Sequence, residues 1–197
     1  MNAYQNFLNF FSMHNKERLD GLTVAYFDAM TQDEKARAYE YLLARIKTGG
    51  VEEDVNGLFL VDPKLAYQDV ANLLKSNQLG REAIIVGAGR LYTDSQDQNL
   101  INIFVSAMSS REKRLRELGA RYVPAIPEPE VVGSLQGMIR TETDRRLLIQ
   151  AATKLLQCCN VTRHTVGTNR YIDLFDGLLS DDTAVKEHSI ASLHSSV

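Results

Sequence analysis

The residues that most resemble a chemical motif are Ile84-Ile85-Val86 followed by Gly87-Ala88-Gly89. An apolar strand that leads into a glycine-rich turn is how a dinucleotide-binding loop begins, because glycines let the backbone approach a pyrophosphate. That motif also needs a small residue three positions after its second glycine, and position 92 is tyrosine. The surrounding strand–helix–strand pattern is missing too. We therefore interpret the segment as part of a helix and expect no nucleotide cofactor.

The other reactive side chains do not form a catalytic or metal-binding pattern. Cys158 and Cys159 are the only cysteines and are adjacent, so a disulfide framework is excluded and core packing is the expected role. The four histidines are scattered, and no two of them have the i, i+4 spacing of a helical metal site. No nucleophile–histidine–acid arrangement can be inferred from sequence order. We expect no metal site and no enzymatic activity.

Composition and charge narrow the class of protein. The chain has 197 residues, of which 44% are hydrophobic and 24% charged, and its net charge is −3. These values are ordinary for a globular protein and do not favour a strongly charged partner. The first cation is Lys16 and no run of apolar residues is long enough for a membrane span. We expect a cytoplasmic protein in a reducing compartment, without membrane association.

Local sequence signals are helical throughout. Apolar residues between positions 3 and 13 recur at spacings of three and four. Thr31 and Glu34 have the spacing of a capping box, and Gly49-Gly50 would end the helix that it starts. Asp62-Pro63 is a second helix start. No segment alternates with period two, so the sequence predicts an all-α protein.

The predicted helices form a repeating pair with a period of about 32 residues, longer at the last step. In the second helix of each pair, three apolar or small positions recur four residues apart. Its columns are Val51, Ala83, Leu115, Leu147 and Val185; Val55, Gly87, Gly119, Ala151 and Ser189; and Phe59, Leu91, Val123, Leu155 and Leu193. Glycine in the middle column costs helix propensity of about 1 kcal/mol. We expect that close packing against the first helix offsets this cost.

The first helix of each pair has a stripe of its own. Its columns are Ala36, Tyr67, Ile101, Val132 and Ile172; Tyr39, Val70, Phe104, Leu135 and Phe175; and Leu43, Leu74, Met108, Ile139 and Leu179. Spacings of three and four residues put each stripe on one helix face. Two such helices can bury their stripes against each other.

Two segments of the chain resemble the second half of a HEAT repeat. Residues 179–193 contain an acidic turn, then Val185-Lys186, then small residues and Leu193, and residues 140–155 follow the same pattern. The resemblance implies a right-handed α-α superhelix, a solenoid of about five HEAT-like helix pairs over residues 31–197. Residues 1–30 would form an N-terminal capping helical pair, so that residues 1–197 make a single domain.

In a stack of such pairs, equivalent positions of successive second helices lie side by side. This places cations and one tyrosine on a common strip, which we call the cationic ridge. Its members are Arg81, Arg90, Lys113, Arg114, Arg121, Tyr122, Arg145, Arg146 and Lys154. Acidic residues such as Glu112 and Glu117 interleave with them, so internal ion pairs are one interpretation of the ridge. Recognition of an acidic protein surface and nucleic-acid binding are the other two.

HEAT-like arrays mostly bind macromolecules, and arginine and tyrosine are prominent in protein interfaces. We therefore expect a non-catalytic protein-binding scaffold or adaptor, for instance an inhibitor such as a bacterial immunity protein that neutralises a toxin. The alternative is a nucleic-acid-binding protein of the HEAT-like DNA-repair glycosylase type. Phosphate binding favours a stronger positive field than this chain carries, so a protein partner is preferred.

Overall fold

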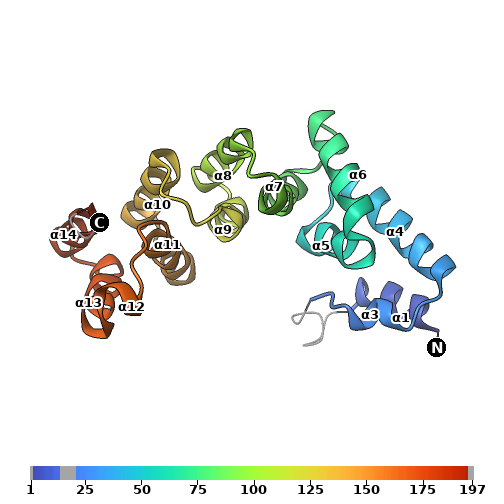
Figure 1. The fold of residues 1–197 in the computed structure, drawn as a ribbon, viewed down its shortest axis with the longest axis horizontal. Helices are drawn as coiled ribbons and strands as arrows, with labels where there is room; N and C mark the ends of the chain where they lie inside the picture. The colour runs from blue at the N-terminus through green and yellow to red at the C-terminus, as the bar shows by residue number, and fades with distance from the viewer. Residues whose placement is uncertain (1, 14–20, 195–197) are drawn as a thin grey trace. The chain divides into compact units, whose positions relative to one another are not determined.

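The structure is a computed structural model that describes residues 2–13 and 21–194 (Figure 1). Within these ranges every regular element is a helix, which confirms the all-α prediction. The described residues form two compact units, Met1–Gln96 and Asp97–Val197, and each unit is considered by itself. The prediction of a single domain is not tested by this division and stays a prediction.

The first unit begins with an aromatic cluster built on two short helices, α1 (Ala3–Phe10) and α3 (Ala25–Asp28). Phe7, Phe10 and Phe27 are buried where α1 packs on α3 and α4. The N-terminal capping pair predicted for residues 1–30 is only partly observed. Residues 14–20 lie outside the described part of the chain, and residues 21–23 are not helical.

Two helix pairs complete the first unit. They are α4 (Gln32–Lys47) with α5 (Glu52–Val61), and α6 (Pro63–Lys75) with α7 (Arg81–Ser95). The predicted capping box is present, since the Glu34 amide donates to Thr31 Oγ1 at 3.2 Å. Asp62 caps α6 by accepting the Leu65 amide at 3.0 Å. The glycine-containing segment lies within α7, so its interpretation as a helix is confirmed.

The second unit contains three helix pairs. They are α8 (Ile101–Met108) with α9 (Lys113–Tyr122), α10 (Pro129–Thr141) with α11 (Arg145–Cys158), and α13 (Thr168–Leu178) with α14 (Thr183–His194). A single 3₁₀ turn, η1 (Gln98–Leu100), precedes α8, and the short helix α12 (Arg163–Val166) precedes α13.

The last pair of the second unit packs in the opposite order from the pairs before it. First helix packs on first helix in α8 and α10, and second on second in α9 and α11. In the last pair, the first helix α13 lies against α11 and the second helix α14 against α10 (Figure 1). Gly167, at φ +83°, lies between α12 and α13 where the chain changes direction. Uniform stacking of equivalent pairs therefore does not extend to the last pair.

Of the predicted columns of each helix, the middle column agrees best with the observed burial. The middle column of the second helices is buried at every position: Val55, Gly87, Gly119, Ala151 and Ser189. The middle column of the first helices is buried at four positions, Tyr39, Val70, Phe104 and Leu135, and half-buried at Phe175. Three outer-column positions were predicted wrongly as core, namely Ala36, Ile172 and Val185. They are exposed because no described helix covers their side of the pair.

The close approach of the two helices in a pair explains the glycines in the middle column of the second helix. A Cβ atom added to Gly87 would lie 2.8 Å from Val70 Cγ1 on the first helix of the same pair. One added to Gly119 would lie 2.9 Å from the Met108 backbone nitrogen and 3.0 Å from Ala107 Cβ. Both distances are shorter than van der Waals contact. The predicted role of these glycines in helix packing is therefore confirmed.

We predict opposite effects of the same substitution at two glycines of the second unit. Gly119→Ala should lower the free energy of unfolding by about 1 kcal/mol, because overpacking of about 1–3 kcal/mol exceeds the gain in helix propensity. Gly133→Ala on α10 meets no atom within 4 Å and should stabilise by about 0.4–1 kcal/mol. Urea unfolding of both variants measures the difference. Equal midpoints would contradict the assigned packing.

Candidate interaction surface

Two members of the cationic ridge, Arg81 and Arg90, belong to α7 in the first unit, and both are exposed. Arg90 donates to Asn56 Oδ1 from Nε at 3.0 Å and from Nη2 at 2.8 Å. Its guanidinium also lies 5.9 Å from the centre of the Phe59 ring. Arg90 therefore links α7 to α5. The continuity of the ridge from these residues to those of the second unit remains a prediction.

In the second unit, polar side chains tie α9 to α11. Lys113 at the start of α9 forms an ion pair with Asp144, which caps α11. Further along, Gln150 Nε2 donates to the Glu117 carbonyl at 2.8 Å. Contacts at both places show that the two second helices run parallel and side by side, as the repeat predicts. Lys113 therefore takes part in an ion pair within the chain.

The more buried of the two ion pairs that α9 forms here was not predicted from the sequence. Arg116 Nε lies 2.8 Å from Glu142 Oε2, and the Glu142 side chain is only 4% exposed. Glu142 also accepts the amides of Thr143 and Asp144. Burial alone would raise the pKa of Glu142, but Arg116 and the two amides hold it below its ordinary value. Glu142, the residue that follows α10, is therefore an ionised anchor between α9 and the turn that leads into α11.

Two arginines of the ridge share one carboxylate on the outer side of α9. Glu117 pairs with Arg114 at 3.3 Å and also with Arg121 one turn later. Glu117 is itself largely buried, with 20% of its side chain exposed, whereas the two arginines are about twice as exposed. Tyr122 at the end of α9 is half-buried. The carboxylate therefore orders two exposed guanidinium groups along this helix.

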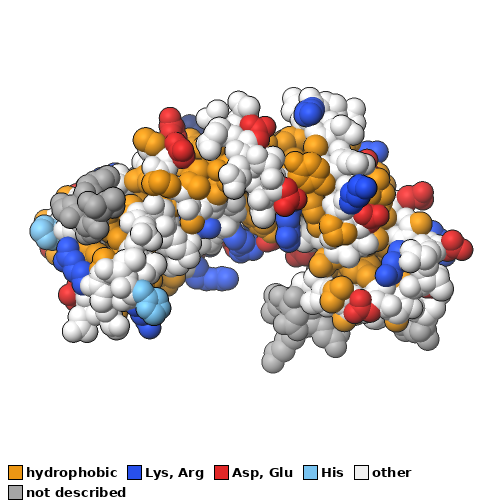
Figure 2. Space-filling model, viewed as in Figure 1, with side chains coloured by type: hydrophobic (Ala, Val, Ile, Leu, Met, Phe, Trp, Pro, Cys, Tyr) orange, Lys and Arg blue, Asp and Glu red, His pale blue; other side chains and the backbone are white. Residues whose placement is uncertain are grey.

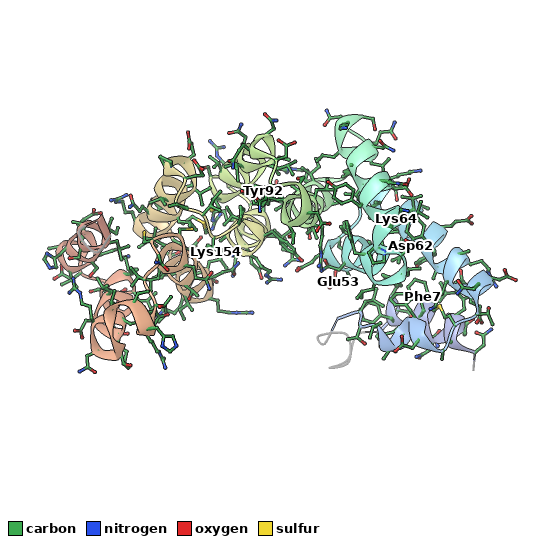
Figure 3. All side chains as sticks on the ribbon, in the orientation of Figure 1. Phe7, Glu53, Asp62, Lys64, Tyr92 and Lys154 are labelled. Carbon is green, nitrogen blue, oxygen red and sulfur yellow. The ribbon has the colours of Figure 1, made fainter. Side chains whose placement is uncertain are left out.

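The ridge residues of α11 have three different environments. Arg145 Nη1 donates to the Leu179 carbonyl at 2.6 Å and is directed to the end of α13. Lys154, labelled in Figure 3, is half-buried, and burial lowers the pKa of its ammonium group. Arg146 is exposed and forms no ion pair with any residue that the structure describes. The sequence pattern had treated all three as equivalent.

An exposed apolar side chain accompanies Arg146. Ile149 follows it by one helical turn and is 40% exposed. Together with Arg114, Glu117 and Arg121 of the adjacent helix, these residues define what we call the α9–α11 face. Lys and Arg side chains are visible along the edge of the second unit that α9 and α11 form (Figure 2). The face combines ordered cations with one apolar side chain, which suits non-covalent contact with another surface.

The predicted role of the cysteines agrees with their surroundings. Cys158 is buried, its Sγ lies 4.0 Å from the Pro124 carbonyl oxygen, and Cys159 is half-buried. Burial raises the pKa of Cys158 to about 11, so this thiol is protonated at neutral pH and is a poor nucleophile. Both cysteines border an open pocket of about 640 Å³ that also contains Pro127, Pro129 and Leu193.

Comparisons with protein-family models, with curated proteins and with solved structures found no match to this chain. Among the described residues, no three histidine, cysteine or acidic side chains gather closely enough to hold a metal ion. None of the described helices combines the length and the apolar character needed to cross a membrane. The α9–α11 face is consequently assessed from its own geometry.

We predict that Glu142→Gln lowers the free energy of unfolding by about 1–3 kcal/mol at neutral pH, because Arg116 loses a charged hydrogen-bond partner. The folded-state pKa of Glu142 lies below its ordinary value of 4.5. Its stabilisation is therefore complete above that pH and is lost as the pH falls through the folded pKa. The variant should also lose part of the acid dependence of stability, measured by urea unfolding above and below pH 4.5.

The matched control is Glu187→Gln, which removes the same charge from the ion pair between Glu187 and Arg140. These two side chains are 44% and 41% exposed, so solvent screens the pair and its loss should change stability little. If both variants unfolded at the same urea concentration, Glu142 would not be the anchor described above.

Proposed function

We propose that this chain is a non-catalytic protein-binding scaffold whose α9–α11 face contacts an acidic surface of a partner protein. The observation that carries the proposal is the exposure of Ile149 one helical turn from the exposed Arg146. Ile149 is 40% exposed, and its burial by a partner would lower the free energy of the complex. Arg146 on the same helix, and Arg114 and Arg121 on the adjacent α9, can provide charge-assisted hydrogen bonds to carboxylates of the partner. Apolar contact surrounded by arginine is common in protein interfaces.

The internal ion pairs support this proposal by ordering the face before a partner arrives. Glu117 holds Arg114 and Arg121, so less side-chain entropy is lost on binding. The links from Lys113 to Asp144 and from Arg116 to Glu142 fix α9 against α11. Internal ion pairing, which was an alternative interpretation of the cationic ridge, therefore accounts for part of it. Arg146 and Ile149 take no part in these ion pairs, so a partner can contact them.

For the architecture we propose a HEAT-like array. Its support is the repeated pairing of helices, with small residues buried at the centre of each second helix. The reversed packing of α13 and α14 is a departure from regular stacking. Such arrays present surfaces rather than reactive groups. We therefore propose that the chain is an adaptor or an inhibitor, such as an immunity protein that neutralises a toxin. This last step rests on analogy.

A double substitution, Arg146→Glu with Ile149→Asp, should abolish partner binding and leave helicity unchanged, because both side chains are exposed. The matched control is Lys64→Glu with Leu65→Asp on α6. Leu65 is 41% exposed, and the two double variants change the net charge equally. Affinity capture from the native host with each variant, followed by mass spectrometry, identifies proteins retained by wild type and control but absent from the α9–α11 variant.

If the two double variants retained the same proteins, the assignment of binding to the α9–α11 face would be wrong. A nucleic acid partner would show itself differently. Binding to DNA or RNA would weaken steeply as salt concentration rises, because each phosphate contact releases counterions. If such salt-dependent binding were observed and the Arg146→Glu and Ile149→Asp variant lost it, the partner of this face would be a nucleic acid and not a protein.

A further inference from the structure

Lys154 on α11 is a cation for which the described part of the chain supplies no counter-charge. The residue is half-buried, and it forms neither a hydrogen bond nor an ion pair with any residue that the structure describes. Every buried side-chain nitrogen of the described residues has a hydrogen-bond partner. The ammonium nitrogen of Lys154 must therefore reach the surface while part of its side chain is covered. A charged group that loses hydration without an opposite charge is destabilising.

Two contacts of α11 with the chain around the end of α9 bracket Lys154. Gln150, one turn before it, donates from Nε2 to the Glu117 carbonyl at 2.8 Å. Cys158, one turn after it, has its Sγ 4.0 Å from the carbonyl oxygen of Pro124, in the segment that follows α9. Residues four apart lie on one stripe of a helix. Lys154 therefore lies beside the last turn of α9 (Figure 3).

The charged residues around this turn leave an excess of positive charge. Glu117 is the carboxylate that pairs with Arg114 and Arg121, so two guanidinium groups already share it. No acidic residue occurs in the sequence between positions 145 and 172, and α11 thus supplies no carboxylate of its own. A carboxylate of a partner would complement the charge of Lys154.

We propose that Lys154 binds a glutamate or aspartate side chain of the acidic partner, which pairs with the ammonium group beside the last turn of α9. The inference rests on the function proposed for the α9–α11 face and adds a contact that the face does not include. Lys154 has already lost part of its hydration in the free protein, so an arriving carboxylate displaces less water than at an exposed lysine. The covered part of its side chain also has less conformational entropy to lose on binding.

The test compares Lys154→Met with the wild-type chain in two measurements. Methionine keeps an unbranched side chain and removes the charge. Loss of an unpaired, half-buried cation should raise the urea midpoint of the free protein. The same substitution should weaken binding of a synthetic peptide rich in glutamate and leucine about tenfold, measured by isothermal titration calorimetry. A purely structural role would not move stability and affinity in opposite directions.

Lys75→Met on α6 is the matched control, because Lys75 is an exposed lysine of the first unit. It changes the net charge equally and should alter neither the urea midpoint nor the peptide affinity. Unchanged affinity of the Lys154→Met variant would overturn the inference. A lower urea midpoint of that variant, or the absence of saturable binding by the wild-type chain, would overturn it as well.

The Arg146→Glu and Ile149→Asp variant separates this inference from the proposed function. If that variant lost peptide binding while Lys154→Met retained it, the α9–α11 face would be supported and the role of Lys154 would be wrong. If Lys154→Met weakened binding and the double variant did not, the role of Lys154 would be supported and the assignment of the face would be wrong.

Discussion

The contact between the two helices of a pair is the interaction on which the rest of this structure depends. At Gly119 the second helix comes so close to the first that the Met108 backbone leaves no room for a side chain. Gly87 meets Val70 in the same way in the first unit. A helix pair closed at this distance buries its apolar stripes against each other. Its remaining faces are then free to carry links to the next pair or to a partner.

Links between pairs use charged residues, and this changes the meaning of the cationic ridge. Two of its members, Lys113 and Arg145, are committed to Asp144 and to the Leu179 carbonyl, so a partner could engage them only by breaking those contacts. The residues that we propose for partner binding are therefore fewer than the ridge suggested, and they include the apolar Ile149.

The repeated columns were predictable because burial follows helical periodicity, and the small residues at Gly87 and Gly119 marked the close contacts in advance. The order of packing in the last pair was not predictable. A turn at Gly167, whose φ is +83°, directly precedes this pair, and the periodic pattern of apolar residues does not predict such a turn. Arg116 and Glu142 were missed for another reason. Aligned repeats reveal positions with similar residues, whereas an ion pair joins dissimilar residues at positions that are not equivalent.

The two arginines at the start of α11 have different environments. Arg145 and Arg146 are neighbours in sequence, yet about 100° of helical rotation separates their side chains. Because α13 packs on α11, Arg145 reaches the Leu179 carbonyl at the end of α13. Arg146 points elsewhere and lies on the exposed face with Ile149. Packing of α13 on α11 therefore separates two adjacent cations, so that Arg145 serves an internal contact and Arg146 belongs to the surface that we propose for an acidic partner.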